Sequence, residues 1–261
     1  MRDFEDDELD DREGDQSRVH GRPPTGSGTG KVFLIVGIVG AVAFLSVAAV
    51  VALLLFSVSR VRESAEKAQE SNDLRQIGLA MQNYETVHGH FPPPARLTRD
   101  GRPGLSWRVE ILPYLEQQNL YAKFKLDEAW DSPTNRPLGQ YTPQPYHSRS
   151  EVLSSNTHYR VFVGSGSLFD PDKKHNLADI KDGAANTLLV VEAADSVPWT
   201  KPDELEYKPG ARLPALGLPN RNFVLALMAD GSVRSVKKNA NATSWYAAIS
   251  FAGNDVPGPD W

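Results

Sequence analysis

The sequence predicts an α+β fold, in which a long N-terminal transmembrane helix continues into a soluble domain with an antiparallel sheet. Residues 32–59 carry no charge, and the apolar positions after them recur at helical spacing as far as Val87. The C-terminal half instead holds β-rich runs separated by turn signals. A helix followed by antiparallel strands is typical of the α+β class. The expected parts are a leader (1–31), a transmembrane helix (32–59), an amphipathic continuation (60–88) and a soluble domain (89–261).

Composition restricts the chemistry. The chain has 261 residues and no cysteine, which excludes disulfides, thiolate metal sites and cysteine nucleophiles. Nine of the thirteen residues from Asp3 to Asp15 are acidic, whereas the chain after Lys31 is nearly neutral. Nucleic acid is therefore not an expected partner. The charged, Gly- and Pro-rich leader predicts disorder, with an acidic docking tail as the alternative.

The uncharged run from Val32 to Ser59 is 28 residues long. About 20 apolar residues cross a bilayer, and a secretory signal has only about 7–15 in its apolar region. The run therefore predicts a single-pass helix with the lipid bilayer as its partner. Small residues on one face would let a second helix approach closely, although they are common in membrane helices generally. These helix-packing residues are Gly37, Ala41, Ala48 and Ala52.

The soluble domain shows clear element boundaries. Gly89 and the run Pro92–Pro94 end the amphipathic helix. Two short helices are expected in "LSWRVEILPYLEQQNLYAKFKLDEAWD", and strands in "YRVFVGSG" and "TLLVVEAA". In "FVLALMADGSVRSVKK", Asp230 and Gly231 form a dipeptide suited to a type I′ hairpin turn. A final short helix, "SWYAAISF", would be capped by Asn241 or Thr243.

An acidic cluster in "DPDKKHNLADIKDG" is a candidate Ca²⁺ site, because closely spaced carboxylates suit that ion. The same residue types also build turns, and this alternative is favoured. No other cofactor is expected. The four candidate ligands are Asp170, Asp172, Asp179 and Asp182.

Signals for catalysis are weak, and the sequence predicts that the protein is not an enzyme. His88 and His90 could supply two metal ligands, but no third is evident nearby. Ser165 lacks the spacing of a nucleophile elbow, although His158 or His175 could serve it as a base.

Closely spaced aromatic residues are a candidate glycan or peptide groove, with a helix–sheet core as the commoner alternative. Trp199, in the Pro-flanked "VPWTKP", is a further candidate for a contact surface. The aromatic set is Trp107, Tyr114, Tyr121, Phe124 and Trp130.

Four blocks resemble a large bacterial family of pilin-like proteins that carry a domain of unknown function and a C-terminal H-x9-DG motif. They are "ESNDLRQIGLAMQNYETVHGHFPPP", "LSWRVEILPYLEQQNLYAKFKLDEAWDSPTN", "IKDGAANTLLVVEAADSVPWTKPDEL" and "ALMADGSVRSV". The resemblance covers residues 59–251. It implies a prepilin-type methylation segment similar to that of type II secretion pseudopilins, and a domain outside the cytoplasmic membrane.

The sequence departs from this family at both ends. The leader is long and acidic. If a peptidase cleaved the chain after Gly30, Lys31 would be the first residue of the mature protein and Ile35 the fifth, at the position where pilins have Glu. Asn220 stands where the motif has His. We therefore expect an uncleaved anchor in the cytoplasmic membrane, with its N-terminus in the cytoplasm and its domain in the periplasm or beyond.

Two functions follow as hypotheses. The first is a structural or interaction role in the cell envelope, related to secretion or surface assembly, through lateral homo- or hetero-oligomers with pilin-like proteins. The alternative is a ligand-binding or sensing module for a carbohydrate, a peptide or Ca²⁺.

Overall fold

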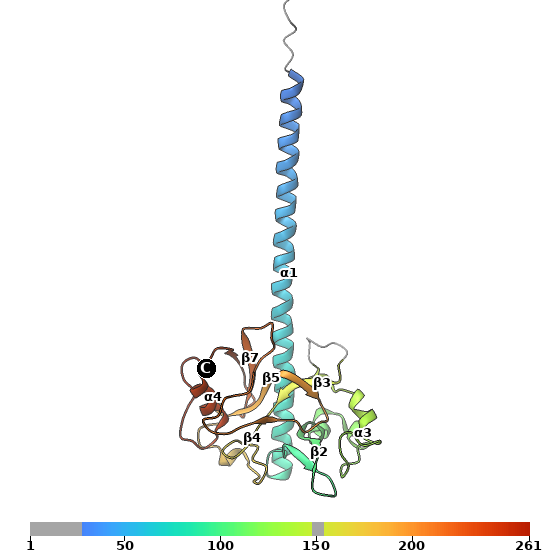
Figure 1. The fold of residues 1–261 in the computed structure, drawn as a ribbon, viewed down its shortest axis with the longest axis vertical. Helices are drawn as coiled ribbons and strands as arrows, with labels where there is room; N and C mark the ends of the chain where they lie inside the picture. The colour runs from blue at the N-terminus through green and yellow to red at the C-terminus, as the bar shows by residue number, and fades with distance from the viewer. Residues whose placement is uncertain (1–27, 148–153) are drawn as a thin grey trace, which may run out of the picture. The chain divides into compact units, whose positions relative to one another are not determined.

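A computed structural model describes residues 28–147 and 154–261 (Figure 1). The chain divides into two compact units, Met1–Ser59 and Arg60–Trp261, and each is considered by itself. In the first unit, the structure describes the beginning of α1 (Gly28–His88), a helix of 61 residues. The predicted acidic leader lies outside the described residues up to position 27. Gly37 is exposed, whereas the side chains of Ala41, Ala48 and Ala52 also lie outside the described part.

The predicted transmembrane helix is wrong. Among the helices of residues 28–147 and 154–261, none offers an apolar stretch that is long enough to cross a membrane. The prediction rested on the length of the run 32–59 and on its lack of charge. The predicted location in the cytoplasmic membrane was based on this segment and stays untested.

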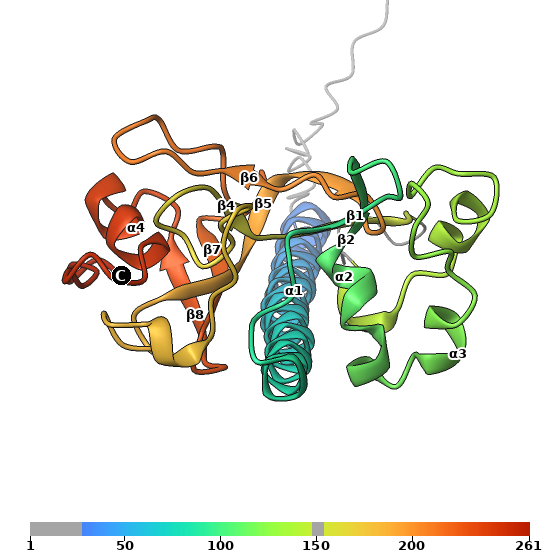
Figure 2. The ribbon, with the colours of Figure 1, turned by 90° about the horizontal axis from the view of Figure 1, so that it is seen from below.

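In the second unit, the α+β part of the prediction holds. Four antiparallel strands form the main sheet in the order β3-β5-β7-β8. Residues 60–88 of α1 cover one face of this sheet, and α4 (Ala242–Ile249) packs on the other. Figure 2 shows α4 and α3 on opposite sides of α1. The strands are β3 (Asn156–Arg160), β5 (Leu188–Pro198), β7 (Phe223–Met228) and β8 (Val233–Lys237).

Alternation along β7 explains the two layers. Leu225 and Leu227 belong to the core beneath α1, whereas Val224 and Ala226 belong to the core beneath α4. Successive side chains of a strand point to opposite faces, so residues 224–228 are buried on one side or the other, whereas Phe223 at the start of β7 is partly buried. Residues 224–228 therefore present no polar face to solvent.

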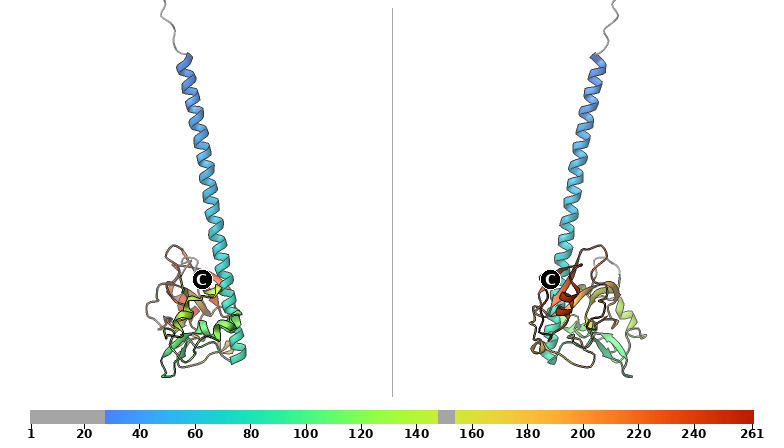
Figure 3. Two further views of the ribbon diagram at one scale, coloured as in Figure 1. Left: turned by 90° about the vertical axis from the view of Figure 1, so that its right-hand side faces the viewer. Right: turned by 60° about the vertical axis from the view of Figure 1, so that its left-hand side comes forward.

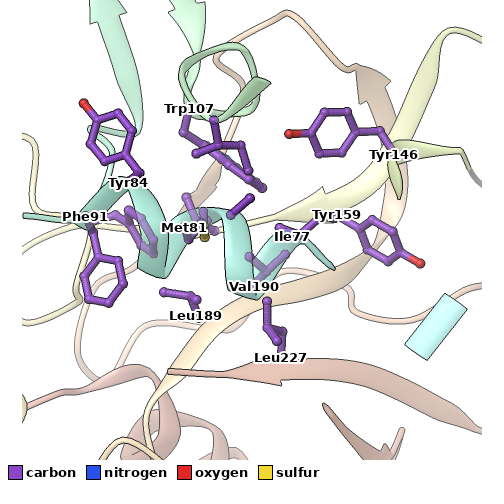
Figure 4. Packing of buried hydrophobic residues seen from close by; sticks show 14 of the residues in the cluster. Ile77, Met81, Tyr84, Phe91, Trp107, Tyr146, Tyr159, Leu189, Val190 and Leu227 are labelled. Carbon is purple, nitrogen blue, oxygen red and sulfur yellow. The ribbon is translucent and has the colours of Figure 1, made fainter. Parts of the chain in front are cut away.

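The amphipathic stripe of α1 supplies the larger core. Ile77 and Met81 are fully buried and face Leu189, Val190 and Leu227 of the sheet (Figure 4). A Cβ added at Gly78 would lie 2.9 Å from a methyl carbon of Leu227, which indicates how closely the helix approaches the sheet. The sheet and its loops lie to one side of this part of α1 (Figure 3).

Short elements connect the helix to the sheet. An antiparallel pair, β1 (Ala95–Leu97) and β2 (Pro103–Ser106), is followed by α2 (Trp107–Glu110), η1 (Leu112–Leu115) and α3 (Gln118–Tyr121). The two predicted short helices are thus three short turns of helix. The segment after α3 is rich in proline and forms η2 (Arg136–Gln140) and η3 (Gln144–Tyr146). A further short helix, η4 (Leu177–Asp179), precedes β5. β4 (Phe162–Val163) and β6 (Leu205–Glu206) form a small parallel pair.

The β7–β8 connection contains Asp230 and Gly231, but its geometry is not that of a type I′ turn. That turn needs positive φ at both central residues. Here Gly231 has φ +85°, whereas Asp230 is not among the described residues with positive φ. The Gly231 N–H donates to the Met228 carbonyl at 2.9 Å, and the Asp230 carboxylate accepts from the N–H of Ser232. A type I turn followed by a left-handed glycine fits this pattern.

Candidate functional site

A cavity of about 510 Å³ opens where α1 ends. The helix stops at Gly89, which has φ +76° and donates its N–H to the Glu85 carbonyl at 2.7 Å. Glycine adopts this left-handed conformation readily, and the proline run that follows cannot continue a helix. The chain therefore turns away, and the last two turns of α1 present Tyr84 and His88 to the cavity.

Aromatic rings form one wall of the cavity. The rings of Tyr84 and His88 are stacked with centroids 4.0 Å apart, and Tyr114 meets both edge-on. The Nε2 atom of His88 lies 3.2 Å from the Tyr114 hydroxyl, within hydrogen-bonding distance. Tyr121 and His90 also line the cavity. Aromatic pairs of this geometry contribute about 0.5–1.5 kcal/mol beyond the area that they bury, so these rings support one another in the wall.

A charged pair lies beside the rings. The Nη1 atom of Arg96 donates to both carboxylate oxygens of Glu110, at 3.0 and 3.2 Å. The Glu110 side chain is only 5% exposed, whereas that of Arg96 is 40% exposed. A buried carboxylate requires such a partner, because burying an unpaired charge is costly. Glu110 thus fixes the guanidinium at the cavity wall.

Burial, with a further contribution from the charge of Glu110, raises the pKa of Tyr84 to about 12. The same two causes, burial first, raise the pKa of Tyr121. A phenol is protonated at neutral pH even at its ordinary pKa of about 10, and a raised pKa extends this to higher pH. Both residues therefore offer hydroxyl groups that can donate and accept hydrogen bonds, rather than charges.

Two polar groups remain open to a ligand, the Nε2 atom of His90 and the ammonium group of Lys174. The Nδ1–H of His90 donates to the Phe91 carbonyl at 2.7 Å, since a carbonyl can only accept. Lys174 is exposed at the rim and makes no ion pair with any described residue. The volume and the mixture of rings with few polar groups match a small-molecule or peptide site.

The predicted Ca²⁺ ligands do not come together in the structure. Asp170 and Asp179 accept hydrogen bonds from nearby backbone N–H groups, and Asp182 holds the C-terminal loop through Gly253 and Asn254. Asp172 is exposed. In the described ranges, no group of three or more His, Asp or Glu side chains is placed to hold a metal ion.

The candidate nucleophile, Ser165, and its possible bases, His158 and His175, lie in different surroundings. Ser165 is exposed in a glycine-rich loop. The Nδ1 atom of His158, which is buried, lies 3.0 Å from the Ala193 carbonyl, and His175 packs against Phe251. The described interactions of these two histidines do not involve Ser165.

The predicted aromatic set divides between the cavity and the core. Tyr114 and Tyr121 line the cavity, whereas Trp107 and Phe124 are buried and Trp130 is partly buried.

The prediction that Trp199 belongs to a contact surface is wrong. Its side chain is fully buried, stacks on Tyr146 and donates its Nε1–H to the Gly139 carbonyl at 2.8 Å. Flanking prolines indicated a loop, but a loop residue can still point inward.

Four polar side chains that line the cavity were not predicted from the sequence. Tyr84 lies one turn before His88, so helical spacing could have paired them. Arg96, Glu110 and Lys174 come from separate segments, and no local pattern relates them. Their proximity is a product of tertiary packing.

A second cluster of charges lies under α1. Arg221 donates to both carboxylate oxygens of Glu70, at 2.5 and 2.8 Å, and its Nη1 lies 3.3 Å from Oε1 of Glu192. Both glutamates are 2% exposed, and Oε2 of Glu192 has no hydrogen-bond partner among the described residues. Burial raises the pKa of Glu192 to about 7, Arg221 opposes this shift, and Glu70 adds to it. Within the described residues, this cluster is part of the core and lines none of the principal cavities.

Comparison with known proteins finds a family match for part of the chain. Residues 59–147 match a family of unknown function. The family, SBP_bac_10, is described as "Protein of unknown function (DUF1559)". The match contains the end of α1, the β1–β2 pair and the α2–α3 segment, and so most of the cavity wall. No curated protein and no solved structure gives a significant match. The predicted resemblance to a family of unknown function is thus confirmed over this range, whereas its pilin-like character and H-x9-DG motif are not.

Proposed function

We propose that residues 60–261 form a ligand-binding module, with the ligand held in the cavity at the end of α1. A carbohydrate or a peptide fits the chemistry of its walls. The observation that carries the proposal is the combination of three tyrosines and two histidines with the fixed Arg96–Glu110 pair around a space of about 510 Å³. Ligand sites are typically concave, of 300–1,000 Å³, and lined by apolar groups with a few placed polar ones.

Each wall has a distinct role in this proposal. Tyr84 and Tyr114 offer ring faces and edges to apolar parts of the ligand. Arg96 and Lys174 offer hydrogen-bond donors and positive charge to its oxygen atoms. The pocket walls are held by their own contacts, so little ordering is required on binding, which favours affinity.

The test is a thermal-shift screen of the full chain against neutral and acidic oligosaccharides and a set of short peptides. A ligand that binds in the cavity should raise Tm for the wild type and not for Tyr114→Ala. Tyr141→Ala is the matched control, because Tyr141 is exposed and lies outside this cavity. Loss of the shift in both variants, or in neither, would contradict the placement of the ligand.

A second proposal is a structural role through lateral association, of the kind that pilin-like proteins make. The observation in its favour is the apolar surface of the first unit, where large side chains on α1 are more than half exposed. Exposed apolar surface of this extent typically marks an interaction site. We propose a second copy of this chain as the partner. Examples of these side chains are Phe33, Leu34, Phe44, Leu45 and Leu53.

The absence of cysteine makes this proposal easy to test, because a single introduced cysteine reports contacts without background. Gly37→Cys should form disulfide-linked dimers on mild oxidation, since Gly37 is exposed on α1. Ser235→Cys, at an exposed site on β8, should remain monomeric. Equal dimer yields for both variants would indicate random collision and refute lateral association through α1.

A further inference from the structure

We infer that β1 is a docking edge for an extended peptide, and that the cavity and an adjoining groove receive the side chains of this peptide. The inference rests on the proposed ligand-binding function and specifies the chemical class of the ligand. Three features carry it: an open strand edge, the continuity of two cavities beside that edge, and an unpaired positive charge between them.

The hydrogen bonds around β1 show which of its backbone groups face outward. The N–H of Thr98 donates to the Arg102 carbonyl, and the Pro94 carbonyl accepts from the N–H of Trp107. Both groups therefore point toward the β2 side. Backbone groups of a strand alternate in direction from one residue to the next. Arg96 then faces β2, and the N–H and C=O groups of Ala95 and Leu97 face away from it.

The pattern on β2 supports this assignment. The Ser106 N–H donates to the Thr200 carbonyl, and the Gly104 carbonyl accepts from the N–H of Trp130. These groups point away from β1, so Leu105 between them faces Arg96, its partner in the register. β2 is thus bonded on both sides, whereas β1 pairs only with β2 among the described strands.

A groove of about 390 Å³ runs along β1 and joins the cavity described above. Pro93, Arg96 and Lys174 line both spaces, so the two are contiguous. The groove is bordered by β1 itself and by two rings, Phe91 and Phe169, whose side chains are almost fully buried. An extended chain on β1 would therefore have apolar recesses within reach of its alternate side chains.

These features match peptide recognition by strand addition. In that mode, main-chain hydrogen bonds supply affinity and pockets for alternate side chains supply specificity. An oligosaccharide lacks a regular series of amide donors and carbonyl acceptors that could pair with Ala95 and Leu97. The short length of β1 and the prolines before it restrict pairing to a few residues, so a short segment is favoured over the edge of another sheet.

Charge further specifies the peptide. Lys174 lies where the two spaces meet, and neither it nor Lys173 makes an ion pair with a described residue. Glu110 is already paired with Arg96, and the carboxylates of Asp170 and Asp172 line only the groove, whereas Lys174 lines both spaces. A carboxylate on the peptide would complement the lysines. We therefore assign the site to a peptide of alternating apolar residues that carries at least one Asp or Glu.

The experiment is selection from a random heptapeptide display library against the full chain. Enriched sequences should alternate apolar residues and contain an acidic one, and their synthetic forms should bind in calorimetry. N-methylation of the alternate amides that pair with β1 should weaken binding by roughly tenfold or more, because a methylated amide cannot donate a hydrogen bond to β1. N-methylation of the intervening amides should change the Kd by less than about threefold.

Variants of the chain provide the complementary test. Ala95→Pro removes the outward N–H, which an edge strand tolerates, and should weaken binding by roughly tenfold with little change in Tm. Lys174→Gln should reduce the preference for acidic peptides. Lys181→Gln is the control, because Lys181 is exposed but lines neither space.

The outcomes separate this inference from the proposed function. Peptides that bind equally well with either N-methylation pattern would refute strand addition and leave the cavity as the site. If no peptide is enriched and an oligosaccharide binds to the wild type but not to Tyr114→Ala, strand addition is likewise refuted and the cavity stays the site. If neither class of ligand binds, both proposals fail.

Discussion

Glu192 provides a quantitative test of the packing beneath α1. Its side chain is 2% exposed, and burial raises its pKa from 4.5 to about 7 despite the nearby Arg221. The folded protein therefore binds this proton more tightly than the unfolded chain does. The resulting stability is fully present below pH 4.5 and is lost as the pH rises to about 7. At 1.36 kcal/mol per unit, the free energy of unfolding should fall by about 3 kcal/mol over this range.

The assay is urea unfolding from pH 4 to pH 8, followed by tryptophan fluorescence. All five tryptophans lie in the unit Arg60–Trp261, so the signal reports that unit. Glu192→Gln cannot titrate, and its stability relative to wild type should rise by about 3 kcal/mol between pH 4 and pH 8. Glu206→Gln, at an exposed site, should track the wild type. A Glu192→Gln profile parallel to that of the wild type would refute the reasoning.

Two further predictions concern buried polar contacts. Arg108→Met leaves Glu204 buried without its partner and should cost about 3–5 kcal/mol in urea unfolding, whereas Arg99→Met, in an exposed pair, should cost less than about 1 kcal/mol. Comparable costs would contradict the burial of the first pair. Trp199→Phe loses a buried hydrogen bond and should cost about 1–3 kcal/mol more by the same assay than Trp261→Phe, because the Nε1–H of Trp261 has no hydrogen-bond partner in the part of the chain that the structure describes. Equal losses would show that this bond contributes nothing.

Signals over a few neighbouring residues correctly predicted features that depend on those residues alone, such as helix faces, helix ends and strands. The stripe containing Ile77 and Met81 follows from helical spacing, and both residues are buried against the sheet. Gly89 marks the end of α1 because a left-handed residue is needed there. The strand-like run of β7 follows from its β-branched and apolar residues.

The candidate site could not be predicted in the same way. Tyr84, Arg96, Glu110 and Lys174 come from four segments, and only tertiary packing brings them together. Trp199 shows the converse, since its neighbours indicate a loop while its side chain is in the core. The transmembrane prediction, drawn from the length and the lack of charge of residues 32–59, is contradicted by the helices of the described residues.

The most direct test of the central claim is a structure of the full chain with a ligand that raises its Tm. We predict that the ligand contacts Tyr84 and Tyr114 and lies within hydrogen-bonding distance of Arg96 or Lys174. A ligand bound elsewhere, for example in the cavity of about 280 Å³ beside Trp245, with the space at the end of α1 unchanged, would contradict the assignment of the site.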